Sequence, residues 1–168
     1  RFPHAYCQSP VCVPARGSII SGLYPNAHGA RTLKDALPGH VRTIAHHFAE
    51  GGYQTAAIGK MHFVDESDRH GFGYRINEAD FRETLTAEEW QSLRDDQRGG
   101  GDVHGRASAL TTRYFQDFFF ADETVRYLRS ERDPGKPFCL WSSYFKPHTP
   151  VVPLREYFDL YDPLSVRL

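Results

Sequence analysis

The feature of this sequence that most constrains its fold is a helical pattern followed at once by an apolar strand, which occurs twice. In the first unit, Thr43 is placed to cap a helix over residues 44–50, and Gly51 and Gly52 end that helix. Residues 53–58 come next and have the length of a short buried strand. A helix joined to a strand by a short connection is typical of open α/β sheets.

The second unit lies towards the C-terminal end of the sequence. Its helix is indicated by apolar side chains at helical spacing, namely Phe118, Ala121, Val125 and Leu128. Residues 133–135 (Asp-Pro-Gly) break this helix, and residues 138–145 predict the second strand. Two such units predict an α/β fold with a mostly parallel sheet flanked by helices.

Composition supports a folded domain and gives no indication of nucleic-acid binding or of membrane attachment. Hydrophobic residues make up 40% of the 168 positions, which is enough for a buried core. The formal net charge of −1 gives no indication of nucleic-acid binding or of attachment to an anionic membrane surface. No apolar run is long enough to span a bilayer.

Between the two units, residues 65–113 are polar, and we expect them to be largely irregular and to form an insertion or a lid. Thr86 and Glu89 have the spacing of a capping box, which predicts one helix over residues 86–93. The glycine-rich residues 98–101 predict a mobile loop.

The motif that carries the sharpest chemical information begins at Cys12. Pro14 fits the first turn of a helix and Gly22 its C-terminal end, so Cys12 would lie at the helix start, where backbone N–H groups favour an anion. Arg16 lies four residues on, and therefore on the same helical face. A nucleophile and a planar cation would converge on one tetrahedral oxyanion. A cysteine phosphatase loop has five residues between its Cys and Arg, whereas three intervene here, so we exclude that class.

Two further motifs come directly after the two predicted strands. An extended chain after the first strand would place Lys60 and His62 on one side, and the prolines of residues 146–150 would hold His148 in a fixed position beside Lys146. The C-terminal ends of parallel strands are where open α/β sheets build their sites. There a Lys can neutralise an anion and a His can move a proton near neutral pH. Taken singly, each motif also fits a solvated loop Lys and a packed His.

The three motifs together resemble those of a known family. Residues 9–22 resemble the signature of type I sulfatases, which are formylglycine-dependent members of the alkaline phosphatase superfamily. Residues 59–62 resemble the family's Gly-Lys-x-His segment, in a form similar to choline sulfatases when taken with residues 70–72. Residues 146–150 are similar to the Pro-His-x-Pro segment, in a form known from iduronate-2-sulfatases.

The resemblance implies an alkaline-phosphatase-like sandwich and hydrolysis of sulfate esters. It implies that a formylglycine-generating enzyme converts Cys12 to formylglycine, whose hydrated form attacks sulfur and also binds calcium. By this resemblance Arg16 and Lys60 stabilise charge, His62 deprotonates the hydrated aldehyde, and His148 contacts the sulfate and protonates the leaving oxygen. The implied substrate is a sulfate-ester small molecule or a sulfated sugar.

Two residues receive weaker interpretations. Lys146 is a further candidate for substrate contact. His70 would reach the substrate only if residues 65–113 fold over the site.

The family's calcium ligands are largely missing from the sequence. Only Cys12, as formylglycine, matches a metal ligand, and the doublet Asp95-Asp96 follows a polar stretch that we interpret as a solvated loop. We therefore expect residues 1–168 to be an internal fragment of a catalytic domain, without the N-terminal Asp-Asp strand and the C-terminal half, and inactive in isolation. A phosphonate monoester hydrolase or phosphodiesterase of the same superfamily and a non-catalytic remnant domain are the alternatives.

Overall fold

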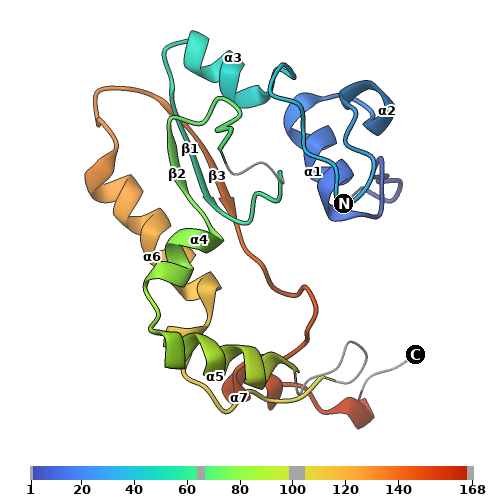
Figure 1. Cartoon of the computed structure of the whole chain (residues 1–168), viewed down its shortest axis with the longest axis vertical. Coiled ribbons are helices and arrows are strands. Elements are labelled where there is room, and N and C mark those ends of the chain that lie inside the picture. The colour runs from blue at the N-terminus through green and yellow to red at the C-terminus, as the bar shows by residue number, and fades with distance from the viewer. Residues whose placement is uncertain (1, 64–66, 99–104, 166–168) are drawn as a thin grey trace.

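The computed structural model describes residues 2–63, 67–98 and 105–165, and is an α/β structure with one sheet (Figure 1). The α-helices are α1 (Cys12–Ser21), α2 (Pro25–His28), α3 (Ile44–Glu50), α4 (Glu78–Glu83), α5 (Ala87–Arg98), α6 (Gln116–Arg126) and α7 (Arg155–Phe158). The strands are β1 (Gln54–Gly59), β2 (Tyr74–Ile76) and β3 (Phe138–Ser143). Single-turn elements occupy Thr112–Tyr114, Tyr127–Glu131 and Pro163–Ser165, the second of them a π-turn that continues α6.

The sheet has three parallel strands in the order β2-β1-β3. The central strand β1 is buried from Thr55 to Gly59, which explains why its sequence is an unbroken run of small and apolar residues rather than an alternating one. Its register pairs Ala56 with Leu140 of β3 and with Tyr74 of β2. The predicted α/β class and parallel sheet are confirmed.

Side chains of β1 alternate between two apolar clusters, one on each face of the sheet. On one face, Ala57 packs with Ile20 of α1, Ala45 of α3 and Phe72. On the other face, Ala56 and Ile58 pack with aromatic and aliphatic side chains of α4, α5 and α6, namely Phe81, Leu93 and Phe120. Figure 1 shows α1 and α3 on the opposite side of the sheet from α6. The sheet is therefore packed on both faces.

The predicted helix ends agree with the structure at two helices. Gly22 follows α1 in the left-handed conformation, with φ 71°, and its N–H donates to the Ser18 carbonyl at 2.9 Å. Thr43 begins α3 as predicted, with His46 as the second half of the capping box. The backbone N–H of Thr43 donates to His46 Nδ1 at 3.1 Å. The short helix α2 follows α1, with Pro25 at its first position.

The described parts of this polar segment, residues 67–98 and 105–113, contain more regular structure than the sequence indicated. The segment supplies β2, which pairs with β1, and helix α4, and both were missed. The predicted capping box of α5 is present, since the Glu89 N–H donates to Thr86 Oγ1 at 3.2 Å and the Thr86 N–H donates to Glu89 Oε2 at 2.9 Å. The helix extends to Arg98, five residues beyond the predicted end. The loop predicted over residues 98–101 lies, apart from Arg98, outside the described residues.

The interpretation of Asp95 and Asp96 as solvated loop was wrong. Both residues lie in α5. Asp96 accepts a hydrogen bond from Ser108 Oγ at 2.6 Å and pairs with Arg106 at 3.2 Å, so it ties the end of α5 to the following segment. A helical carboxylate with these partners has a structural role.

The buried face of α6 also differs from the prediction. Phe118 and Val125 are 36% and 44% exposed, whereas Phe120 and Tyr127 are 0% and 3% exposed. The two buried residues are seven positions apart with the polar Glu123 and Thr124 between them, so contact with β1, rather than the helical period, selects this face.

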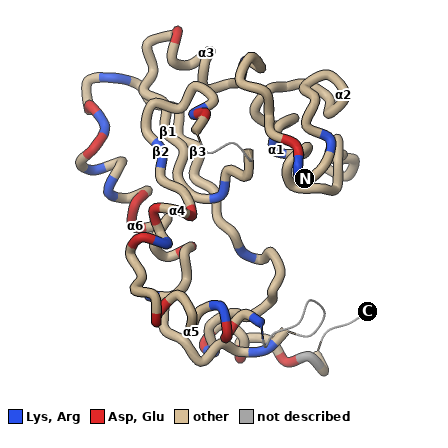
Figure 2. Tube along the Cα trace, in the orientation of Figure 1, with Lys and Arg blue, Asp and Glu red and all other residues tan. Residues whose placement is uncertain are grey.

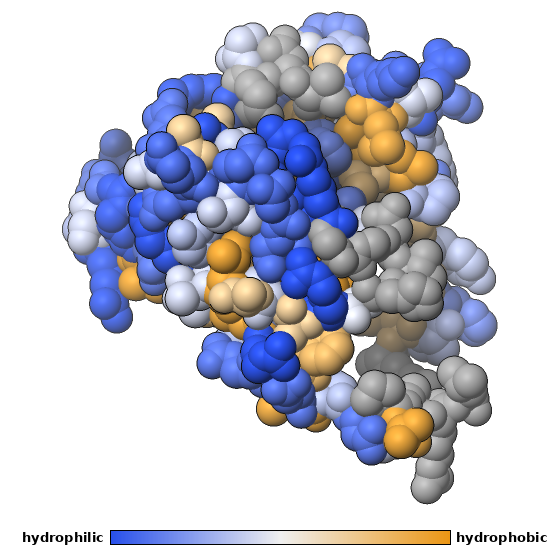
Figure 3. All heavy atoms as spheres, turned by 60° about the horizontal axis from the view of Figure 1, so that its bottom comes forward, coloured by the Kyte–Doolittle hydropathy of each residue, from blue (hydrophilic) through white to orange (hydrophobic). Residues whose placement is uncertain are grey.

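The surface carries charge of both signs, with acidic residues gathered along α4 and α6 (Figure 2). On the face seen in Figure 3, apolar side chains form separate patches among hydrophilic ones. Among the described residues, no helix combines the length and apolar character needed to cross a bilayer.

Candidate active site

The start of α1 and the C-terminal ends of β1 and β3 meet at one edge of the sheet, and Arg16 joins them. Its Nη1 donates to the Lys60 carbonyl at 2.7 Å and to Ser143 Oγ at 3.0 Å. The Lys60 N–H in turn donates to the Ser143 carbonyl at 2.9 Å. These bonds fix the guanidinium against two strand ends, on the helical face that also carries Cys12.

Gly59 makes the close approach of β1 and β3 possible. It has a φ of 97°, in a region that side-chain-bearing residues rarely adopt. A Cβ atom at this position would lie 1.8 Å from the Ser143 carbonyl oxygen. Only glycine therefore allows the strand to end where Lys60 begins.

Lys60 is buried, with 3% of its surface exposed. Its ammonium lies over the ring of Phe145, 4.1 Å from the centroid, a favourable cation–π contact. Burial lowers the pKa of Lys60, and the nearby Arg16 lowers it further, whereas negative charge at Cys12, Glu78 and Asp117 raises it. The two cations face one region in which an anion would relieve their repulsion.

Cys12 is half-buried in the first turn of α1, where Val11 provides no side-chain cap. A helix start without such a cap leaves backbone N–H groups available to an anion. Burial lowers the pKa of Arg16, and negative charge at Cys12 opposes this effect, so the two side chains lie close enough to interact. Cys12, Arg16 and Lys60 are thus brought together as the sequence predicted.

His62 reaches this group by a different path from the predicted one. Its φ is 60°, so the chain bends after β1, and the expectation of a continued extended strand was wrong. The buried His62 Nδ1 has no hydrogen-bond partner among the residues that the structure describes. Burial lowers the pKa of His62, and the positive charges of Lys60, Arg16 and His148 lower it further. The imidazole is therefore kept neutral near neutral pH, as a proton acceptor requires.

The loop after β3 carries the remaining candidates. His148 is exposed, its ring centroid lies 5.1 Å from that of Phe145, and its N–H donates to the Phe145 carbonyl at 3.1 Å. Lys146 Nζ donates to the carbonyls of Pro150 at 2.6 Å and His148 at 3.3 Å. The Lys146 ammonium is therefore engaged within its own loop, whereas His148 is near enough to His62 to affect its pKa.

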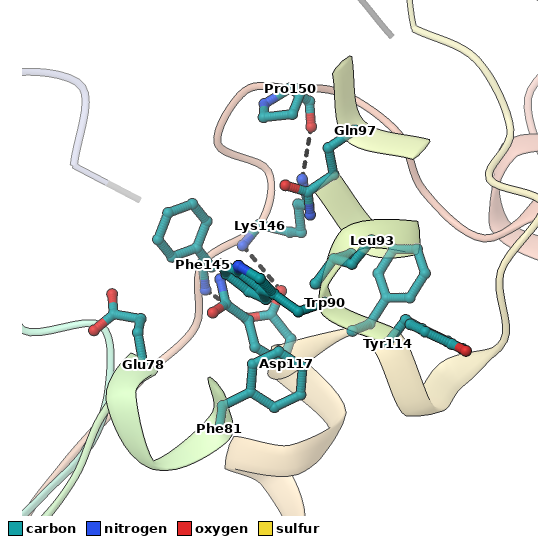
Figure 4. A pocket seen from close by; sticks show the side chains of 12 residues that line it. Glu78, Phe81, Trp90, Leu93, Gln97, Tyr114, Asp117, Phe145, Lys146 and Pro150 are labelled. Atoms are coloured by element: carbon teal, nitrogen blue, oxygen red, sulfur yellow. Dashed lines mark hydrogen bonds between the residues drawn. The ribbon is translucent and has the colours of Figure 1, made fainter. Parts of the chain in front are cut away.

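A pocket lies on the α5 side of this loop (Figure 4). Several of its lining side chains are aromatic, including Phe81, Trp90, Tyr114 and Phe145. Since Phe145 also contacts the Lys60 ammonium, the pocket and the cluster around Cys12 share one wall.

Three supporting residues were not identified from the sequence. Ser143 holds Arg16, Phe145 lies beneath Lys60, and Asp117 accepts hydrogen bonds from the loop that carries His148. Phe145 is the last residue of the predicted strand, and this position was its one indication in the sequence. His70 is buried, with its ring 5.1 Å from that of Phe63 and its carbonyl bonded to Thr43 Oγ1, so it serves packing.

The described residues do not supply a calcium site. Among them no group of three or more His, Cys, Asp and Glu side chains is arranged to hold a metal ion. Calcium takes six to eight oxygen ligands, and no such set surrounds Cys12 in this part of the chain. The residues present therefore do not by themselves fit the ion that the resemblance implied.

The fold and the site define a class of α/β protein that places a potential nucleophile near the buried Lys60 and the half-buried Arg16 at one edge of a parallel sheet. Residues 1–164 match the family model described as Sulfatase. The chain belongs to the sulfatase family.

Two curated relatives illustrate the similarity. The chain is 31% identical over 178 residues to a choline-sulfatase of Rhizobium meliloti (strain 1021), with 96% of this chain and 34% of the relative covered. It is 30% identical over 185 residues to an arylsulfatase of Clostridium perfringens (strain 13 / Type A), with 95% of this chain and 38% of the relative covered. The chain thus spans about a third of the length of these relatives.

Solved structures share the fold. A phosphonate monoester hydrolase of Agrobacterium radiobacter superimposes with a TM-score of 0.68 at 23% identity, over 96% of this chain and 36% of that one. A protein solved with its substrate D-glucosamine-2-N,6-O-disulfate gives a TM-score of 0.65 at 22% identity, over 94% of this chain and 29% of that one. These neighbours support the alkaline-phosphatase-like fold.

Proposed function

We propose that this chain carries the nucleophile side of the active site of a sulfate ester hydrolase, with formylglycine formed from Cys12. The observation that carries the proposal is the convergence of Cys12, Arg16 and Lys60, held by the bonds from Arg16 Nη1 to the Lys60 carbonyl and to Ser143 Oγ. A sulfate ester presents the tetrahedral anion that this pair of cations suits. Membership of the sulfatase family supports the same reaction.

Formylglycine would supply a hydrated aldehyde, in which one hydroxyl attacks sulfur and the other later allows the sulfate to leave. Arg16 and Lys60 stabilise the oxygens on which negative charge develops, because both cations are already in place when the charge forms. Both cations are held by backbone, side-chain or ring contacts before any substrate arrives. Little reorganisation is then needed during the reaction.

The two histidines divide the proton transfers. His62 is neutral because burial and neighbouring cations lower its pKa, and its buried Nδ1 is unpartnered, so it is suited to accept a proton beside the nucleophile. His148 arrives on the separate loop after β3 and donates a proton to the departing oxygen. Lys146 strengthens the positive potential of that loop and reaches substrate only if it leaves its own carbonyl partners.

The active enzyme, in this proposal, is longer than the present sequence. Its calcium ligands, apart from the modified Cys12, come from other parts of the polypeptide, so residues 1–168 alone turn over sulfate esters poorly. The described residues 78–97 cover the alcohol side of the substrate, since several of them line the pocket beside the loop after β3. The substrate is a sulfate-ester small molecule or a sulfated sugar.

A phosphonate monoester hydrolase is the second candidate, because a solved enzyme of that kind shares the fold. The full-length enzyme, produced with a formylglycine-generating enzyme, is assayed on 4-nitrophenyl sulfate and on a 4-nitrophenyl phosphonate monoester. The proposal predicts a larger kcat/KM for the sulfate. A larger value for the phosphonate would assign the second function, and the Cys12→Ala variant provides the background rate for both.

A further inference from the structure

Asp117 connects helix α6 to the loop that carries His148. It lies in the first turn of α6, and its carboxylate accepts the N–H groups of Phe145 and Lys146, the latter at 3.1 Å. Figure 4 shows its carboxylate directed towards the backbone of these two residues. The contacts join positions 28 and 29 residues apart in the sequence.

These bonds are not an ordinary helix cap. An acidic residue in the first turn usually interacts with the N–H groups or the dipole of its own helix. Here the cap residue of α6 is Phe115, and no side-chain cap bond is formed. Both oxygens of Asp117 instead serve the loop, and an ionised carboxylate is a strong acceptor for two N–H donors.

The two amides lie at the base of the loop, so their position determines where the catalytic part of the loop lies. Phe145 places its ring beneath the Lys60 ammonium and beside His148, and its carbonyl accepts the His148 N–H. A shift of this backbone would move the ring and the imidazole together. Displacement of a catalytic group by about 1 Å can slow a reaction by roughly 10²-fold.

The negative charge of Asp117 also affects the pKa values of two nearby lysines. Burial lowers the pKa of Lys146, and the Asp117 carboxylate opposes that effect. It also opposes the lowering of the Lys60 pKa. Asp117 therefore favours the charged form of both ammonium groups, in addition to its two hydrogen bonds to the loop backbone.

We propose that Asp117 is a positioning residue that holds the loop of Phe145 to His148 against the nucleophile side of the site. It touches no reacting atom and acts through the placement of His148. The inference rests on the proposed function for its effect on catalysis, but the contact itself does not depend on that function.

The test compares Asp117→Ala and Asp117→Asn with a matched change, Asp122→Asn, on the same helix. The first measurement is hydrogen exchange of a peptide spanning residues 144–150 in the full-length enzyme. Asp117→Ala should exchange faster by on the order of 2–10-fold, which corresponds to the loss of a hydrogen bond. Asp117→Asn keeps one acceptor and should be intermediate, and Asp122→Asn should match the wild type.

The second measurement is the ratio of kcat/KM for an alkyl sulfate to that for an aryl sulfate with a good leaving group. A good leaving group needs little protonation, so misplacement of His148 affects it little. Asp117→Ala should reduce the alkyl value by roughly 10–100-fold and the aryl value far less, as His148→Ala should. A purely structural role would reduce both alike.

Each outcome decides a separate point. Unchanged exchange in Asp117→Ala would overturn the proposed contact, and faster exchange with equal losses on both esters would overturn its catalytic effect. A wild-type enzyme that hydrolyses no sulfate ester would refute the proposed function. The exchange result would then still decide whether Asp117 holds the loop.

Discussion

Substitution of Gly59 by alanine would place a methyl group at the point where β1 and β3 approach most closely. The added Cβ would lie 1.8 Å from the Ser143 carbonyl oxygen, and the residue would also have to adopt a φ of 97°. The backbone strain costs about 1–3 kcal/mol. Separation of the strands would also break the 2.9 Å bond between the Lys60 N–H and that carbonyl, at about 0.5–1.5 kcal/mol. We therefore expect Gly59→Ala to lower the free energy of unfolding by about 1.5–4.5 kcal/mol, the sum of these two contributions.

Gly52→Ala is the matched control for this substitution. Gly52 also has a positive φ, 82°, but no atom lies within 4 Å of the Cβ position, so only the backbone strain applies. Urea denaturation of the two variants and the wild type distinguishes the cost of backbone strain, which both variants have, from the cost of the close Cβ contact, which only Gly59→Ala has. Gly59→Ala should also lose activity, because Lys60 moves with the strand end. Equal losses of stability in the two variants would refute the idea that the approach of β1 to β3 requires glycine.

Two further predictions concern the charges of the site. Because burial and nearby cations lower the pKa of His62, the acid limb of kcat/KM should lie below the ordinary imidazole range, and activity should fall as the pH drops through that lowered pKa. Lys60→Met removes one of these cations and should therefore raise the pKa of His62. The acid limb of the pH–rate profile should move to higher pH. A shift to lower pH would contradict the assignment of this limb to His62. Ser143→Ala removes one of the two bonds of Arg16 Nη1 and should reduce kcat/KM by about 2–10-fold. An unchanged kcat/KM would show that Ser143 does not help to hold the guanidinium.

The sequence was sufficient for the elements whose causes are local. The end of α1 at Gly22 and the start of α3 at Thr43 result from the conformational and hydrogen-bonding properties of single residues. The buried strand β1 results from an apolar run of the right length. These local signals gave the correct fold class.

The elements that were missed depend on contacts distant in the sequence. Strand β2 has three half-buried residues and no apolar run, and its pairing with β1 makes it a strand. The buried face of α6 was misassigned because the polar Glu123 and Thr124 lie between Phe120 and Tyr127, so the helical period favours the face of Phe118 until β1 is in place. No local pattern contains this information.

The same distinction applies to the site. Cys12 and Arg16 are four residues apart on one helix, so their proximity can be inferred from the sequence. The bend that carries His62 and the bonds of Asp117 to the loop after β3 involve a positive φ and partners 28 and 29 residues away. Such features become visible only when the strand ends are placed side by side.

The chemical state of Cys12 tests the proposed reaction most directly. The protein is produced together with a formylglycine-generating enzyme, its thiols are alkylated, and the tryptic peptide of residues 2–16 is weighed. Conversion removes about 18 Da relative to the thiol form, and Cys7 in the same peptide provides an internal control. We predict an aldehyde at Cys12 and one alkylated thiol, at Cys7. Two alkylated thiols, in the presence of an enzyme that converts a known sulfatase peptide, would contradict the proposed nucleophile.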